Sequence, residues 1–306
     1  MNRIYPDGSS YAWTPEMGED GIIIRVSKST LTSTKWCAQQ MFLSKIHDIE
    51  EEKHHWLITG DDVHRAIEEY YDRIDTDILS DLRKSALSGN NRSVETTLRG
   101  FLPNKEELIA GRREENRDEP FYERDYNLNI DWMMKNEVAR LMISDPEKFM
   151  PVANEVRLDV ESEIEGVPVR LIGIIDRVFR DEDGGLGLME LKTGKWNPTY
   201  KVSDMKLEMS YYKMLIEMSD PDFLAKEGLT GDVTHWGWRY SAADHVTYEK
   251  CSKVSERAMK VRLGKLVKMY LNEQFDMINS GGKEGWKCAR CDYMQYCPQF
   301  QAEVST

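Results

Sequence analysis

The fold is decided by residues 171–195, LIGIIDRVFRDEDGGLGLMELKTGK, in which two apolar runs each end in charged residues. The turn signal Asp183-Gly184-Gly185 separates the runs, so the pattern predicts two strands joined as a hairpin. A third strand is predicted just before them, because Val156, Leu158 and Val160 alternate with polar residues. These three strands form the predicted centre of the fold.

Outside this centre the spacing of apolar residues is mostly helical. It predicts helices over 29–52, 61–78, 131–143, 205–218 and 255–277, and short strands over 234–240 and 246–248. The segment 103–125 is dense in Glu and Arg, which favours an exposed loop or insert. We therefore predict an α/β fold with a mixed central sheet: a mainly helical region over 1–150, a core over 151–250, and a helix with a cysteine-rich end over 251–306.

Composition limits the class of protein. With 40% hydrophobic and 31% charged residues in 306, the chain has the balance of a globular protein with a solvated surface. It shows no membrane-length apolar stretch and no signal peptide, so we expect a cytoplasmic protein that does not bind membranes. The net charge of -13 counts against a protein that coats DNA, but an enzyme that holds a divalent metal needs acidic ligands.

Asp176, Glu190 and Lys192 are the most informative residues. Asp176 ends one predicted strand, while Glu190 and Lys192 lie two residues apart on the next, so the period of two places them on one face. Two neighbouring carboxylates with an ammonium suit Mg²⁺ or Mn²⁺ and phosphodiester hydrolysis. Taken alone, the same triplet is more often a salt-bridge pattern on a solvated face.

The residues around this triplet favour the metal site over the salt-bridge pattern. Residues 173–178, GIIDRV, and 189–195, MELKTGK, resemble the paired motifs of the RecB-like branch of the PD-(D/E)XK nucleases. The resemblance implies a restriction-endonuclease-like core. It also implies that His64, Asp176, Glu190 and the carbonyl of Leu191 bind the metal.

Further site roles come from the same resemblance. It implies that Lys192 positions the attacking water and that Tyr212 lines the site, as part of a Gln-x-x-x-Tyr motif. Glu208 stands where the family has Gln, so either Glu208 assists the metal or the alignment is shifted there. By spacing alone, His64 would be a helix cap or surface residue, and Tyr212 would be core.

The cysteines form a one-plus-three pattern, with Cys37 far upstream of Cys288, Cys291 and Cys297. In a cytosolic protein such a set indicates metal binding rather than a disulfide. The pattern is similar to the [4Fe-4S] site of the four-cysteine RecB-like nucleases, and zinc is the less favoured occupant because zinc ribbons present two close pairs. A cluster there would fasten the N-terminal helix to the C-terminal tail.

The function implied by the resemblance is metal-dependent cleavage of DNA, most simply by an exonuclease acting on single strands or free ends in recombination, repair or DNA processing. Two alternatives stay open: a catalytically idle iron-sulfur module that binds DNA or assembles a recombination or CRISPR-adaptation complex, and a zinc-clasped protein with other chemistry. The sequence has no Gly-x-x-x-x-Gly-Lys-Ser/Thr loop, so ATP-driven unwinding would need a helicase or recombination partner.

Overall fold

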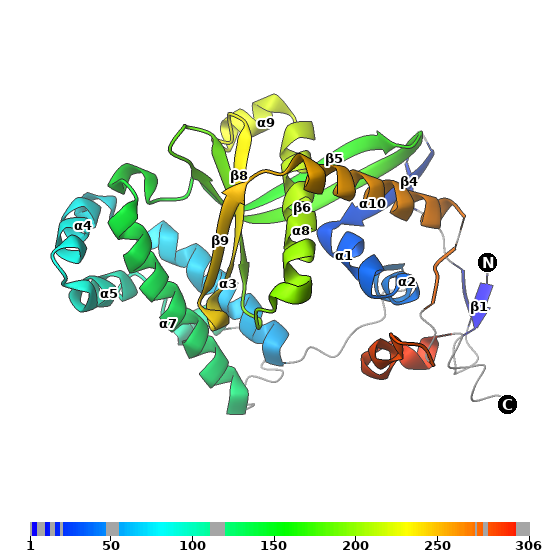
Figure 1. Cartoon of the computed structure of the whole chain (residues 1–306), viewed down its shortest axis with the longest axis horizontal. Coiled ribbons are helices and arrows are strands. Elements are labelled where there is room, and N and C mark those ends of the chain that lie inside the picture. Colours follow the sequence, from blue (N-terminus) through cyan, green and yellow to red (C-terminus); the bar gives the residue numbers. More distant parts are fainter. Residues whose placement is uncertain are drawn as a thin grey trace.

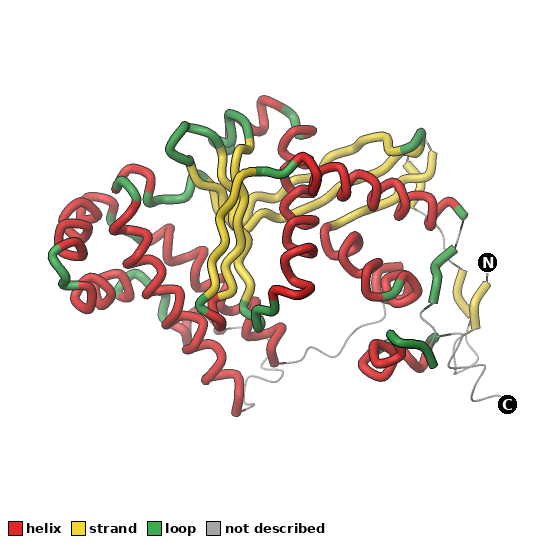
Figure 2. The backbone as a smooth tube through the Cα atoms, in the orientation of Figure 1, coloured by secondary structure: helices red, strands yellow, loops and turns green. Residues whose placement is uncertain are grey.

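A mixed sheet of seven strands forms the centre of the protein, with helices flanking it (Figures 1 and 2). The computed structural model describes residues 2–4, 10–12, 16–18, 21–46, 55–110, 120–272, 274–277 and 281–297. The strands of the sheet are β3 (Glu16–Gly18), β4 (Gly21–Ser27), β5 (Ala153–Ile164), β6 (Val167–Arg180), β7 (Leu186–Lys192), β8 (Val233–Tyr240) and β9 (His245–Lys250). A separate antiparallel pair joins β1 (Asn2–Ile4) to β2 (Ser10–Ala12).

Strand β6 organises this sheet. One of its edges pairs antiparallel with β5 along 167–178. The other edge pairs first with β4, parallel over 169–172, and then with β7, antiparallel over 177–180. Between these two pairings lie residues 173–176, where β4 and β7 part; we call this place the fork. Strand β8 continues the sheet beside β7 as a parallel neighbour, and β9 closes that edge.

Helices lie on both sides of the sheet. They are α1 (Lys28–Trp36), α2 (Ala38–Ile46), α3 (His55–Arg73), α4 (Leu79–Leu87), α5 (Asn91–Arg99), α6 (Lys105–Ile109), α7 (Pro120–Ile143), α8 (Pro198–Met218), α9 (Pro221–Lys226) and α10 (Lys253–Leu271). Short 3₁₀ helices are η1 (Thr76–Ile78), η2 (Pro146–Lys148), η3 (Ser241–Ala243), η4 (Gly285–Arg290) and η5 (Met294–Tyr296). None of the described helices combines the length and the apolar character needed to cross a bilayer.

Two hydrophobic clusters hold these layers together. The larger one joins one face of the sheet to α1, α2, α8 and α10. The smaller one lies within α3 to α7 and reaches the sheet at Leu191. Because side chains alternate along β7, Leu188 belongs to the larger cluster and Leu191 to the smaller. Figure 1 shows α3, α4, α5 and α7 gathered at one end of the molecule, away from α1, α2 and α10.

A buried charge network ties the helical end to the sheet. Glu137 of α7 is fully buried and accepts hydrogen bonds from Arg140, at 2.6 Å, and from Arg239 of β8, at 2.9 Å. Arg177 of β6 donates to the Tyr71 hydroxyl of α3, which also accepts from Arg140. These contacts fix α3 and α7 against the strands that carry the candidate site.

The predicted centre is confirmed, since the three strands exist as β5, β6 and β7 in a mixed α/β sheet flanked by helices. The helix predicted over 29–52 is instead two helices up to Ile46, α1 and α2, because Cys37 between them is extended; 47–52 lie outside the described residues. A capping box of Ser27 and Thr30 starts α1. The helix predicted over 255–277 ends at Leu271.

Three further expectations need correction. The helix predicted over 61–78 is α3, which begins at His55 and ends at Arg73; Gly60 therefore lies inside it, where a Cβ would meet Thr193 Oγ1 at 3.2 Å. Asp62 therefore does not open the helix; it is buried and accepts a hydrogen bond from Tyr122 at 2.8 Å. The segment 103–125 contains α6 and the start of α7, while 111–119 lie outside the described residues.

Candidate active site

The fork brings three predicted site residues together. Asp176 is the last residue of the stretch of β6 that pairs with neither β4 nor β7. On β7, Met189 pairs with Arg177, and Glu190 is the next residue. The main-chain amide of Leu191 donates to Asp176 Oδ2 at 2.6 Å. Asp176 and Glu190 are therefore the next positions across the β6–β7 hairpin after the Arg177–Met189 pair.

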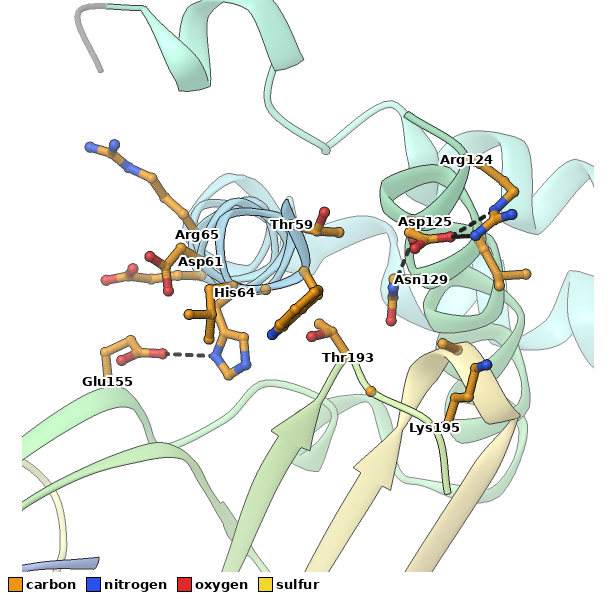
Figure 3. Close-up of a pocket in the computed structure, with 17 residues that line it drawn as sticks. Thr59, Asp61, His64, Arg65, Arg124, Asp125, Asn129, Glu155, Thr193 and Lys195 are labelled. Atoms are coloured by element: carbon orange, nitrogen blue, oxygen red, sulfur yellow. Dashed lines mark hydrogen bonds and ion pairs between the residues drawn. The ribbon is translucent and has the colours of Figure 1, made fainter. Parts of the chain in front are cut away.

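His64 and Glu155 complete a group with Asp176. His64 Nδ1, on α3, lies 3.8 Å from Glu155 Oε1 and 3.8 Å from Asp176 Oδ1. One ligand atom from each of the three residues lies within 4.8 Å of the others, a spacing that suits a metal ion. Figure 3 shows the His64 ring and the Glu155 carboxylate pointing toward one another.

Glu155 reaches this group through an unusual backbone. Its strand neighbours Asn154 and Val156 pair with Arg177 and Ile175, but Glu155 itself leaves the ladder with a φ of 47°. Side-chain-bearing residues seldom adopt this left-handed conformation, and they retain it where the surroundings enforce it, often at functional sites.

Glu190 is held by two ammonium groups. Its Oε1 accepts a hydrogen bond from Lys192 at 2.7 Å and another from Lys28, the first residue of α1. Lys192 also donates to Glu208 Oε2 of α8 at 3.0 Å. The other oxygen, Glu190 Oε2, is buried and completes no hydrogen bond of good geometry among the described residues.

Burial and charge shift the proton equilibria of these groups in opposite directions. Burial, together with the charge of Glu190, raises the pKa of Asp176. Burial opposes ionisation of Glu190 too, but Lys192 and Lys28 outweigh it and hold the pKa of Glu190 below its usual range. Burial lowers the pKa of His64, but Asp176 and Glu155 outweigh it and the net shift is upward. The charges of Asp176 and Glu190 therefore act on each other and on His64.

The helix after β7 also contributes to the site. Tyr212 of α8 is buried, and Lys28 Nζ lies 5.0 Å from the centre of its ring. Burial and the charges of Glu190, Asp176 and Glu208 raise the pKa of Tyr212. Glu208, four residues before Tyr212 on the same helix, contacts Lys192 directly.

Sequence reasoning missed two of these residues. Lys28 lies in a Ser/Thr-rich helix start and carries no motif of its own. Glu155 lies at the start of an alternating strand, where its charge is ordinary. The available signal was topological, since both positions are brought to Asp176 by the pairing of β4 and β5 with β6.

A pocket of about 900 Å³ adjoins His64 and Glu155. It lies between α3, α7 and the Thr193–Lys195 loop, and Figure 3 shows residues from these elements around it. Its lining includes the apolar side chains of Trp56, Leu57 and Leu128 and the cationic side chains of Arg65, Arg124 and Lys195. The candidate metal group therefore opens into a space with both apolar and charged walls.

A sequence profile of the PD-(D/E)XK nuclease superfamily matches residues 25–298 of this chain. The chain belongs to the PD-(D/E)XK nuclease superfamily. Among solved structures it is similar to one described as "Crystal structure of SSO0001", with 12% sequence identity and a TM-score of 0.34 over 88% of this chain and 97% of that one. A comparison with curated proteins finds no significant match.

Membership confirms the predicted resemblance at the level of the superfamily and implies a metal-dependent nuclease that acts on DNA. The donor set of this nuclease fits Mg²⁺ or Mn²⁺, because it consists of carboxylate oxygens and one imidazole. Glu190 Oε2, which is buried near the Tyr212 hydroxyl, completes no hydrogen bond of good geometry among the described residues and so keeps a lone pair for a cation.

The cysteine-rich end of the nuclease lies against α1. The rings of Trp36 and Trp286 meet edge to face at 5.2 Å, and Lys287 donates to the carbonyl of Trp36 at 3.4 Å. Burial raises the pKa of Cys291 to about 11, and the charges of Cys37 and Cys297 add to this shift. The fold brings Cys37 close enough to the C-terminal set to act on Cys291, and none of the five cysteines forms a disulfide.

Proposed function

We propose that this chain is a Mg²⁺- or Mn²⁺-dependent exonuclease that acts on single-stranded DNA or free DNA ends during recombination, repair or DNA processing. The observation that carries the proposal is the fork, where His64, Glu155 and Asp176 lie within metal-binding distance beside Glu190 and Lys192. No other group of three or more His, Cys, Asp or Glu side chains in the described parts of the chain has this spacing.

The metal would be held by His64, Glu155 and Asp176, whose ligand atoms lie within 4.8 Å of one another, with Glu190 and the carbonyl of Leu191 as further ligands. A bound divalent ion polarises a phosphodiester and lowers the pKa of a water molecule. Lys192, held between Glu190 and Glu208, would orient that water and offset negative charge as it develops on the phosphate. Tyr212 lines the buried side of the site.

The pocket beside His64 supports an unpaired strand as substrate. Its volume of about 900 Å³ takes a few nucleotides of one strand rather than a double helix. The apolar wall includes Trp56, on which a base could stack, and Lys195 offers a cation to phosphates, whereas Arg65 and Arg124 already pair with Glu69 and Asp125. An end-acting exonuclease needs such a path from the strand end to the metal.

For the C-terminal region we propose a [4Fe-4S] cluster held by Cys37, Cys288, Cys291 and Cys297, with zinc as the less favoured occupant. The contacts of Trp36 with Trp286 and Lys287 support the proposal, because they bring the distant Cys37 to the C-terminal set. A cluster there would act as a clasp between α1 and the C-terminal segment rather than as part of the cleavage site.

Digestion of end-labelled linear strands, with a circular single strand alongside, tests the proposed function. With Mn²⁺ the chain should shorten linear strands from an end and spare the circle, and EDTA should stop the reaction. Asp176→Asn and Lys192→Met should each lower the rate at least about 100-fold, since each removes a group that acts on the metal or the developing charge.

Asp159→Asn and Lys206→Met are matched controls, because these residues form ion pairs with Arg170 and Glu249 at 2.8 and 2.9 Å, outside the fork. Both controls should cleave at the unaltered rate. Cleavage of the circle would refute the exonuclease assignment. If the unaltered chain binds DNA but never cleaves it, the idle-module alternative replaces the proposal.

A further inference from the structure

Lys28 is a second cation at the fork, in addition to the lysine of the nuclease motif. It forms an ion pair with Glu190 Oε1 and lies 4.0 Å from Glu208 Oε2. The Lys28 side chain is 26% exposed and that of Lys192 is 27% exposed, whereas Glu190 is 1% exposed. Both ammonium groups therefore lie on the solvent side of the buried carboxylate, where a substrate would approach.

The topology of the sheet enforces this position. Strand β4 runs parallel to β6, and its last residue, Ser27, pairs with Ile172, so the chain delivers Lys28 directly to the fork. Lys28 is also the first residue of α1, whose first turn contains no acidic residue. A cation at a helix N-terminus opposes the helix dipole, so the local sequence alone does not favour lysine there.

The charges at the fork give Lys28 a role that the nuclease motif alone does not fill. Glu155, Asp176, Glu190 and Glu208 carry four negative charges when ionised, and Lys28, Lys192 and a divalent ion together balance them. Without Lys28 the loaded site would carry one net negative charge. A DNA strand brings further negative charge, which such a site would repel.

Lys28 does not line the pocket, and the contacts that link it to His64 pass through Glu190 and Asp176. The pocket touches His64 and Glu155 but neither Glu190 nor Lys28. His64 lies 3.8 Å from Asp176. Asp176 accepts a hydrogen bond from the β7 strand that carries Glu190, and Glu190 pairs with Lys28. A strand that enters through the pocket and crosses the metal would meet Lys28 next.

We propose that Lys28 is a substrate-binding residue, which leaves Glu190 when the metal binds and contacts a phosphate of the DNA strand outside the pocket. The inference rests on the proposed nuclease function and names a contact for its substrate. The competing view is that Lys28 only balances the charge of Glu190 and never touches DNA.

Salt dependence of DNA binding separates the two views. Each phosphate that a protein contacts on a single strand contributes about 0.7 to the slope of log affinity against log salt concentration. Anisotropy of a labelled 20-nucleotide strand would be titrated in KCl, with Ca²⁺ in place of Mn²⁺ and a gel to verify an intact strand. Lys28→Met should lower the magnitude of the slope by about 0.7, which is about fivefold weaker binding at 0.1 M salt.

Lys35→Met is the matched control, since Lys35 lies on the same helix and forms an ion pair with Asp204 outside the fork. Its slope should stay unchanged, and Lys28→Arg should keep the unaltered slope because the charge remains. Should Lys28→Met lose its fold, judged by circular dichroism, Lys28→Gln takes its place.

A Lys28→Met slope equal to that of the unaltered chain would overturn the phosphate contact and leave charge balance as the role of Lys28. Cleavage of DNA by the unaltered chain with Mn²⁺ is measured separately. Failure of that reaction would refute the proposed function, whereas cleavage together with an unchanged slope would refute the Lys28 contact alone.

Discussion

Replacing Glu137 by Gln should destabilise the fold by about 3 kcal/mol. Glu137 is fully buried, and hydrogen bonds from Arg140 and Arg239 hold it between α7 and β8. Burial disfavours its charge, but Arg140 and Arg239 outweigh burial and lower its pKa from 4.5 to about 2. A shift of that size corresponds to about 3 kcal/mol, and breaking a buried ion pair costs a similar amount, roughly 3–5 kcal/mol.

Urea unfolding followed by tryptophan fluorescence measures this effect. Because the folded-state pKa is lowered, the stabilisation is fully present above the unfolded-state pKa and is lost as the pH falls toward 2. The difference between the unaltered chain and Glu137→Gln should therefore be largest near neutral pH and shrink below about pH 4.5.

Glu95→Gln is the control, since its pair with Arg99 lies on the surface of α5 and should contribute less than about 1 kcal/mol. A Glu137→Gln loss no larger than that of Glu95→Gln, or a difference that grows in acid, would refute the reasoning.

Two further predictions concern the metal and the clasp. Glu155→Gln should weaken Mn²⁺ binding about tenfold or more in calorimetry, because the substitution removes a charge from the group formed with His64 and Asp176. Glu161→Gln, on the same strand, should leave the Mn²⁺ affinity unchanged. Equal affinities of the two variants would exclude Glu155 from the site. The purified chain should contain iron and absorb at about 400 nm. Cys291→Ser should remove that absorbance, whereas the control Cys251→Ser should keep it. Zinc in place of iron would contradict the cluster proposal.

The core of the fold could be predicted from sequence because its signals are local. Alternation in 156–160 and the glycine-rich turn at 183–185 determine β5, β6 and β7, and the two-residue period places Glu190 and Lys192 on one face. The same hairpin brings Asp176 to Glu190, so this part of the site followed from spacing.

The rest of the site depends on pairings between distant segments. Strand β4 and its parallel pairing with β6 bring Lys28 to Glu190, 162 residues further along the chain. The left-handed backbone at Glu155 has no sequence signal, because Glu rarely adopts it. The predicted helix start after Gly60 was wrong, because Gly60 lies inside α3, where the absence of a Cβ lets Thr193 approach closely.

Anomalous scattering from a crystal soaked in Mn²⁺ would examine the fork most directly. We expect a peak roughly 2.1 Å from oxygens of Asp176 and Glu155, with the ring of His64 among its ligands. Strong manganese peaks elsewhere, combined with an empty fork at saturating Mn²⁺, would contradict the assignment of this place as the metal site of the nuclease.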